Sequence, residues 1–324
     1  MTPSTRECTF AAAAAAGLLL LASGCARHEP GTFATPEEAV ETLDGLIGSE
    51  DDAKIEEVFG PGSVELFSTG DHNEDLRIAE RVKSLIAERV AFEEIDDDTR
   101  VAYFGEEDWP FPIPLVRTGE RWRFDTEAGR EEMLNRRIGR YELQTLTSLH
   151  ELVDAQIEYA AEGRDGNPRA FAQRFLSTEG LHDGLYWPTE EGEPPSPLGD
   201  LLAAADVEVE ASEPFQGYRY RMLTGQGANA PGGARSYLDA GGLLTGGFAA
   251  VAWPAKYGNS GVMTFLVNHR DIVFQKDLGP DTESAAAAIE LFDPDPTWEP
   301  TADDLETAEA AAEAAARGAQ EGST

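Results

Sequence analysis

A long helical pattern in the middle of the chain constrains the fold more than any other feature. Residues Glu127 to Ala161 favour helix, and we expect two segments that meet near Gly139. Apolar residues recur at helical spacing and form a wide stripe: Leu143, Leu146, Leu149, Leu152, Val153, Ile157 and Ala160. The pattern stops at Gly163–Pro168, and the regions on either side follow different periodicities.

The region before this pattern predicts a small α+β lobe over residues 35–135. Thr35 is the expected N-cap of a first helix, with Pro36 at its first position and Glu38 completing a capping box. Further helices are expected at 55–59, 64–67 and 73–92, and strands at 100–104, 115–117 and 121–125, of which the last two form a hairpin. This order resembles cone-shaped NTF2-like domains.

The region after it predicts a second lobe over residues 136–300, in which the long helix packs on an antiparallel sheet. A short helix is expected at Ala170–Leu176, and strands at 217–224, 247–253, 262–268 and 271–276, with a tight link at His269-Arg270. The plan resembles pilin-like envelope domains. Residues 301–324 are Ala/Glu-rich without large apolar side chains, so we expect a disordered acidic tail that cannot pack.

The N-terminus has the organisation of a secretory signal peptide over residues 1–24. Arg6 precedes an apolar run that is too short to span a membrane, and small residues follow it. The stretch from Leu21 to Cys25 resembles a bacterial lipobox, although Ala22 stands where a large aliphatic residue is usual. We therefore expect Cys25 to be lipidated and residues 25–34 to form a tether; the alternative is a plain cleaved signal with an incidental cysteine.

The residue after the expected lipidated cysteine and the net charge predict the location of the protein and the classes of partner that it repels. Residue 26 is Ala and not Asp, which favours the periplasmic face of the outer membrane. The formal net charge of −36 repels nucleic acid and anionic headgroups. An acid-rich, lysine-poor surface indicates adaptation to high salt; a surface for cations or a cationic partner is the alternative. Cys8 lies in the signal, so a mature chain starting at Cys25 has no disulfide.

Several motifs approach known chemistry without completing it. His150-Glu151 begins a zinc-protease helix, but Asp154 occupies the place of the second histidine, so a helix-surface histidine is expected. Ser260 lies in a predicted turn before a strand and not in a nucleophile elbow. Gly225–Ala230 matches a relaxed dinucleotide fingerprint, but no helix follows, which indicates a flexible loop. The oxygen-rich pairs Asp165/Asn167 and Asp293/Asp295 lack the further ligands of a calcium loop, so solvated turns are expected. We expect no metal and no cofactor.

Aromatic and proline-rich segments are the most suggestive candidate surface for a partner. Trp109 and Phe111 belong to a stretch whose prolines exclude a central strand, and Tyr186 and Trp187 precede a second such stretch. If exposed, these four residues would form a surface for a peptide, a glycan or a protein. The alternative is that they pack loops against the two lobes.

Segments spread along the chain resemble one protein family. They are 107–115, 122–126, 131–139, 183–188, 193–199, 257–265 and 275–282. Together they are similar to the domain of unknown function 2950 family of bacterial envelope proteins, over roughly residues 33–300. The resemblance implies an exported, often lipid-anchored protein and brings no established activity. Arg164–Pro168 stands where the family carries an acidic Asp-Gly-Asp-type loop, which argues against a cation site there.

Two functions are therefore expected from the sequence. The favoured one is a non-catalytic envelope lipoprotein that binds or scaffolds an envelope protein or peptidoglycan. The alternative is an envelope hydrolase or a cell-wall-acting enzyme whose carboxylates converge only in the fold. Paired buried carboxylates in a cleft, or a histidine with an oriented acid, would favour the enzyme.

Overall fold

The computed structural model describes residues 31–49, 51–67, 72–163, 169–189, 195–199 and 214–310. The expected signal peptide, Cys25, the 164–168 loop and the end of the tail lie outside these residues. The described residues combine helices with antiparallel sheets, which confirms the predicted α+β class. The chain divides into two compact units, called unit 1 (Met1–Gly129) and unit 2 (Arg130–Thr324) below. The two units thus meet between residues 129 and 130, whereas the sequence pattern predicted a boundary between residues 135 and 136.

The helices of unit 1 begin where the capping signals predict. Thr35 caps α1 (Pro36–Leu46), and its side chain accepts a hydrogen bond from the Glu38 N–H. The Glu38 carboxylate accepts in return from the N–H of Ala34, one residue before the position that a standard capping box uses. The remaining helices are α2 (Asp52–Phe59), the 3₁₀ turn η1 (Val64–Leu66) and α3 (His72–Glu88).

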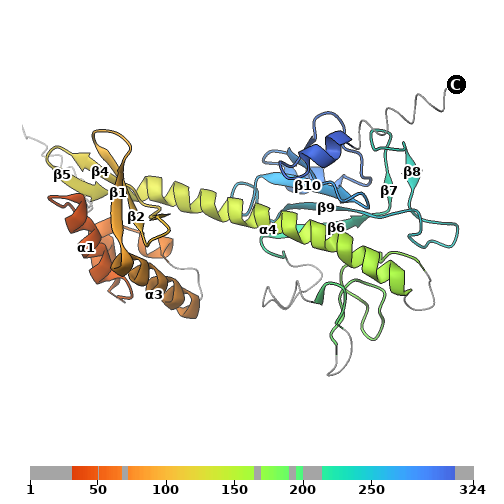
Figure 1. Cartoon of the computed structure of the whole chain (residues 1–324), viewed down its shortest axis with the longest axis horizontal. Helices are drawn as coiled ribbons and strands as arrows, with labels where there is room; N and C mark the ends of the chain where they lie inside the picture. The colour runs from red at the N-terminus through yellow and green to blue at the C-terminus, as the bar shows by residue number, and fades with distance from the viewer. Residues whose placement is uncertain are drawn as a thin grey trace, which may run out of the picture. The chain divides into compact units, whose positions relative to one another are not determined.

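The sheet of unit 1 is antiparallel, with strand order β1-β2-β4-β5 and β3 paired to β2 (Figure 1). The strands are β1 (Val90–Glu94), β2 (Thr99–Phe104), β3 (Trp109–Pro110), β4 (Leu115–Thr118) and β5 (Arg121–Phe124). The 115–125 hairpin is confirmed, but the helix predicted to reach Phe92 ends at Glu88. Residues 90–94 pair instead with β2, because Phe92 packs into the core from the sheet.

The core of unit 1 lies between its helices and one face of the sheet. Its centre is aromatic: the Phe59 ring lies 4.7 Å from the Phe124 ring, and the Phe33 ring lies 5.9 Å from it. Phe33 also forms a β-bridge with Trp122, so the chain enters the unit along β5. Aromatic contacts of this kind add to the burial of large apolar area.

The central helix is α4 (Thr126–Glu162), and it corrects two details of the prediction. It runs unbroken through Gly139, where an added Cβ would meet nothing within 4 Å; the roughly 1 kcal/mol propensity cost of one glycine is tolerated in a helix of this length. Leu143 and Ile157 were placed in the buried stripe, yet they are 65% and 55% exposed. At 100° per residue they lie on the flank that points away from the buried positions.

Unit 2 packs α4 against an antiparallel sheet in the order β12-β11-β10-β9-β6. The strands are β6 (Tyr218–Leu223), β9 (Ala249–Pro254), β10 (Met263–Asn268), β11 (Phe274–Asp277) and β12 (Glu299–Pro300). A separate ladder joins β7 (Gly225–Gln226) to β8 (Arg235–Ser236), and the short helix α6 (Thr282–Ala287) contacts β9. The Glu142 carboxylate of α4 accepts the N–H groups of Val262 and Met263 at 2.8 and 3.0 Å, which ties the helix to β10.

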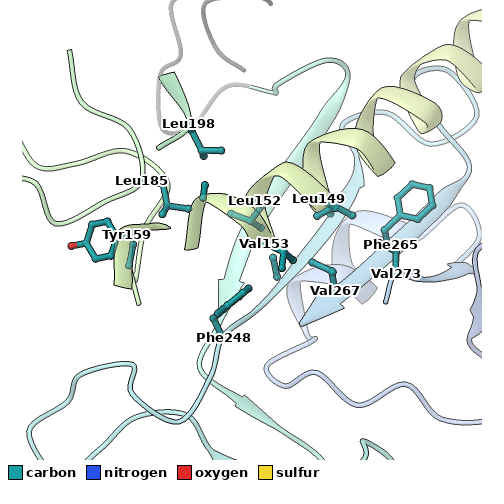
Figure 2. Close-up of a cluster of buried hydrophobic side chains, with 14 of the residues drawn as sticks. Leu149, Leu152, Val153, Tyr159, Leu185, Leu198, Phe248, Phe265, Val267 and Val273 are labelled. Atoms are coloured by element: carbon teal, nitrogen blue, oxygen red, sulfur yellow. The ribbon is translucent and has the colours of Figure 1, made fainter. Parts of the chain in front are cut away.

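Both faces of the sheet in unit 2 are buried. One face packs against α4, where Leu149, Leu152 and Val153 meet side chains of the sheet (Figure 2). All of β9 is buried, since Ala250 and Ala252 belong to this core and the alternate residues belong to a second core with Phe292. Ala250 and Ala252 thus face the α4 side of the sheet, and Ala249 and Val251 face the other side.

Two segments of unit 2 differ from the prediction. Residues 170–176 are not helical: the Phe171 N–H donates to Leu244 O, and the buried amide of Gln156 bonds both backbone groups of Ala172. The prediction that residues 301–324 cannot pack is wrong for their beginning. Thr301 is 2% exposed and Asp304 6% exposed, because polar side chains fasten the segment, and residues 305–310 continue as helix.

Candidate functional site

The aromatic residues expected to form a partner surface are largely core residues. Phe111 is 6% exposed, with its ring centroid 5.4 Å from that of Phe104, and Trp109 is half-buried against the same core. In unit 2, Trp187 is 6% exposed and its ring is stacked at 4.4 Å on the ring of His182. Tyr186 is half-buried beside it. Phe111 and Trp187 therefore pack their segments against the units, which was the alternative interpretation of the pattern.

Unit 1 contains an apolar cavity of about 550 Å³ between its helices. Apolar side chains line it from the α1, α2, η1 and α3 regions and from the segment after β3: Leu43, Leu46, Ile47, Ile55, Phe59, Val64, Phe67, Leu76, Ile78, Ala79, Val82 and Phe111. Among the described residues, the polar members of the lining are Ser49, Asp52 and Asp75. Cavities of this size and lining are typical of sites for small apolar ligands.

No sequence pattern marks this cavity, because the apolar residues of each helix, taken separately, look like ordinary core residues. Ile78 and Val82 have the helical spacing of an inward-facing stripe, yet Ile78 is 45% exposed. Leu76 lies on the opposite flank of the cavity-facing side of α3 and is 43% exposed. Exposed apolar residues next to an apolar cavity are the signal that distinguishes this face from a closed core.

A polar turn in unit 2 brings distant residues together. The turn runs from Asn268 to Asp271 between β10 and β11, and Asp271 adopts a left-handed backbone with φ of +56°. Its carboxylate lies 2.7 Å from Nδ1 of His150 on α4, while Nε2 of the same ring lies 3.7 Å from the Asp304 carboxylate. His150 is therefore not an isolated surface histidine; it connects α4, the turn and the C-terminal segment.

The neighbouring His269 is held in its neutral form. Burial lowers the pKa of its ring, and the nearby cations Arg235 and Arg270 lower it further. Its Nε2 lies 3.2 Å from the Arg235 guanidinium. Because arginine only donates hydrogen bonds, Nε2 accepts, which places the remaining proton on Nδ1. Arg270 follows His269 directly in the sequence, whereas Arg235 is brought to the ring only by the fold.

The glycine-rich segment after β6 is a fixed structure and not the flexible loop that we expected. Gln226 is 2% exposed, and its amide nitrogen donates to the carbonyls of Pro231 and Gly233 at 3.0 and 2.8 Å. Its amide oxygen accepts from the Tyr237 hydroxyl at 2.9 Å. Gly227 packs so closely on Asp293 that an added Cβ would overlap that carboxylate. No helix opens after the segment, so the dinucleotide motif has no phosphate-binding terminus.

A second cavity of about 320 Å³ lies between this segment, the polar turn and the C-terminal residues. Its apolar lining includes Ile272, Phe274 and Phe292. Its polar lining consists of Asn229, Asn268, Arg270 and Glu309. The walls come from parts of the chain that are remote in sequence, and no single motif marks them.

The remaining motif residues have structural partners. The Ser260 hydroxyl accepts from the Lys256 N–H at 3.0 Å and donates to the Lys256 carbonyl, as a turn serine does. Asp293 accepts from the Asn229 N–H, and hydrogen bonds from Thr297 lower the pKa of Asp295. Within the described residues, no group of three or more His, Cys, Asp or Glu side chains is placed to hold a metal ion. No helix in the described part of the chain is both long and apolar enough to span a membrane.

The fold and these cavities define an α+β protein with two compact units, each with its own cavity. The chain belongs to the family described as protein of unknown function (DUF2950), whose model matches residues 31–301. The match confirms the family that the sequence segments indicated. No curated protein and no solved structure matches the chain. The resemblances to NTF2-like and pilin-like domains therefore stay predictions.

Proposed function

We propose that this protein is an exported, lipid-anchored envelope protein that binds an apolar chain in unit 1. Export and anchoring are supported by the sequence, in which a signal-like segment and small residues precede Cys25. Ala26 supports the periplasmic face of the outer membrane as the place of the anchor. The binding role rests on one observation, the apolar cavity of about 550 Å³.

The occupant that fits this cavity best is the acyl chain of a membrane lipid. A methylene group takes up about as much room as a water molecule, roughly 30 Å³, so the cavity accommodates a chain of roughly 16–18 carbons. Burying each methylene contributes about 0.8 kcal/mol. Among the described residues that line the cavity, Asp52 and Asp75 are acids and none is a base. This charge disfavours a free fatty-acid carboxylate and favours a lipid with a neutral headgroup.

The position of the anchor supports this occupant. The Gly31 N–H donates to the Glu57 carbonyl at 2.7 Å, so the described chain begins on α2. Ile55 and Phe59 of the same helix line the cavity. Cys25 precedes Gly31 by only six positions, a length of chain that spans at most ~20 Å. A lipidated Cys25 would therefore keep unit 1 close to the acyl chains of the membrane.

Replacing Cys25 with serine is expected to abolish lipid attachment and membrane retention, because serine offers no thiol for the diacylglyceryl group. The measurement is metabolic labelling with a radioactive fatty acid, followed by separation of membrane and soluble fractions. Wild-type chain is expected in the labelled membrane fraction and the Cys25→Ser chain in the unlabelled soluble fraction. Unchanged fractionation of the variant would contradict the anchor.

Filling the unit 1 cavity is expected to weaken binding of an acyl chain by about tenfold or more. The indole ring would occupy space that several methylene groups of the ligand otherwise fill, so the ligand would bury less apolar surface. Ala79→Trp introduces this bulk from α3, where Ala79 lines the cavity. The measurement uses the chain from residue 25 onwards with Cys25→Ser, which retains every described residue, and tritiated hexadecanol as the neutral probe.

The matched control is Ala87→Trp, because Ala87 is exposed on the same helix and does not line the cavity. It is expected to bind hexadecanol as the parent chain does. Two results would overturn the proposal: no saturable binding to the parent chain, or equal binding by the Ala79→Trp and Ala87→Trp variants.

One observation favours the alternative of an envelope hydrolase, namely the His150 ring oriented by Asp271. The same geometry argues against it. The second ring nitrogen of His150 faces Asp304, whose carboxylate is 6% exposed and engaged by two further donors. Both ring nitrogens thus face acids, and neither faces a nucleophile. We therefore favour binding over catalysis.

A further inference from the structure

We propose that the cavity of unit 2 binds a small apolar carboxylate, of the size of one apolar amino acid or of the last residue of a peptide. Arg270 would pair with the carboxylate, and the apolar floor would hold the side chain. This site is separate from the unit 1 cavity in its residues, its charge and its ligand class. It does not depend on the function proposed for unit 1.

The cavity is held in shape by buried polar groups in each of its walls. Gln226 fixes the carbonyls of Pro231 and Gly233 above it, and the Tyr237 hydroxyl holds Gln226 in turn. Asn268 is 2% exposed, lines the cavity and accepts the Arg270 N–H at 3.0 Å. Satisfied networks of this kind preorganise a binding site, because the ordering cost is met during folding and not during binding.

The C-terminal wall is fastened in the same way. The Asp304 carboxylate accepts from the Val273 N–H and from the Thr301 hydroxyl, both at 2.9 Å. The helical turn that follows carries Ala308 and Glu309 to the cavity. All three walls are therefore rigidly supported before any ligand arrives.

The charge at the rim selects an anion. In a chain of net charge −36, Arg270 is exposed at the cavity, and among the described residues no carboxylate lies within ion-pair distance of its guanidinium. A guanidinium presents a planar pair of donors that matches a carboxylate. Glu309 on the rim is an acid that a ligand ammonium would complement.

The floor and the size select an apolar residue. Phe292 is 1% exposed and Ile272 6% exposed, and together with Phe274 they form an apolar base. At roughly 30 Å³ for each methylene-sized group, about 320 Å³ accommodates on the order of ten such groups. This volume matches leucine or phenylalanine with its backbone.

The test is calorimetric titration of the full mature chain with three related probes. N-acetyl-leucine carries only the carboxylate, leucinamide only the ammonium, and leucine both. We expect N-acetyl-leucine and leucine to bind and leucinamide not to bind. Tighter binding of leucine would assign a free amino acid through Glu309, whereas tighter binding of N-acetyl-leucine would assign the end of a peptide. Binding of leucinamide alone, or of none of the three at millimolar concentration, would overturn the proposal.

Two pairs of variants locate the site. Arg270→Gln is expected to weaken N-acetyl-leucine binding by about tenfold or more, whereas Arg140→Gln removes an exposed charge from α4, away from the cavity, and is expected to bind normally. Ala308→Trp fills the cavity and is expected to abolish binding, while Ala302→Trp places the same bulk on an exposed position. Equal affinities within either pair would show that the ligand binds elsewhere.

Discussion

Replacing Phe248 with alanine lowers the free energy of unfolding by about 3–5 kcal/mol. Phe248 is completely buried in the core between α4 and the sheet, close to Val153 in the core shown in Figure 2. Its ring centroid lies 4.9 Å from that of Phe171 and 6.2 Å from that of His269. Removal of the ring loses the burial and leaves a cavity that the strands cannot close. This cost is a large share of the roughly 5–15 kcal/mol that stabilises a typical domain.

The measurement is urea denaturation followed by tryptophan fluorescence, which reports on unit 2 through Trp187, Trp253 and Trp298. The matched control is Leu143→Ala on α4, which truncates an apolar side chain that is 65% exposed. We expect the control to change the free energy of unfolding by no more than about 0.5 kcal/mol. A Phe248→Ala variant as stable as that control would show that the packing described for unit 2 is wrong.

Replacing Asp304 with alanine is expected to lower the free energy of unfolding by about 2–4 kcal/mol and to release the C-terminal segment. Asp304 is 6% exposed, and its carboxylate accepts hydrogen bonds from the Val273 N–H and the Thr301 hydroxyl. Nε2 of His150 lies 3.7 Å from the same carboxylate. Val273 is completely buried, so its N–H finds no water when the acceptor is lost. An orphaned buried donor costs more than the hydrogen bond itself contributes.

Hydrogen exchange at the Val273 amide measures this effect directly, since its protection depends on the Asp304 side chain. Asp303→Ala is the matched control, because it removes the same charge from a neighbouring residue that is exposed. Asp304→Asn keeps an acceptor oxygen and is expected to lie between the two. Undiminished protection of Val273 in Asp304→Ala would exclude the fastening role.

Much of the local structure was predictable, because it depends on neighbours along the chain. The N-cap at Thr35 and the Pro36 start of α1 follow from interactions within one helical turn. The 115–125 hairpin follows from alternating apolar residues around a glycine-containing turn. Segments whose partners are remote were predicted wrongly. Residues 170–176 have helix-compatible side chains, but Gln156 and Leu244 take their backbone groups.

The sites were less predictable than the elements. His150, Asp271 and Asp304 are spread over half the chain, and no spacing rule connects them. The unit 1 cavity was equally hidden, because the apolar residues that line it fit a simple core pattern in each helix. The aromatic segments gave the opposite error, because they suggested a partner surface where the structure has core residues. Phe111 and Trp187 stand out among prolines and polar residues, yet the cores of the units bury them.

The sequence by itself determined the family, the α+β class, the ends of several helices and the expectation of a lipidated Cys25. These depend on composition and on contacts within a few residues, which a linear pattern records. Only the tertiary structure decided which apolar residues remain around a cavity, that His150 meets two acids, and that the chain still packs at Asp304. These outcomes depend on contacts between residues far apart in the chain, where burial of a polar group is tolerated only when a remote partner satisfies it.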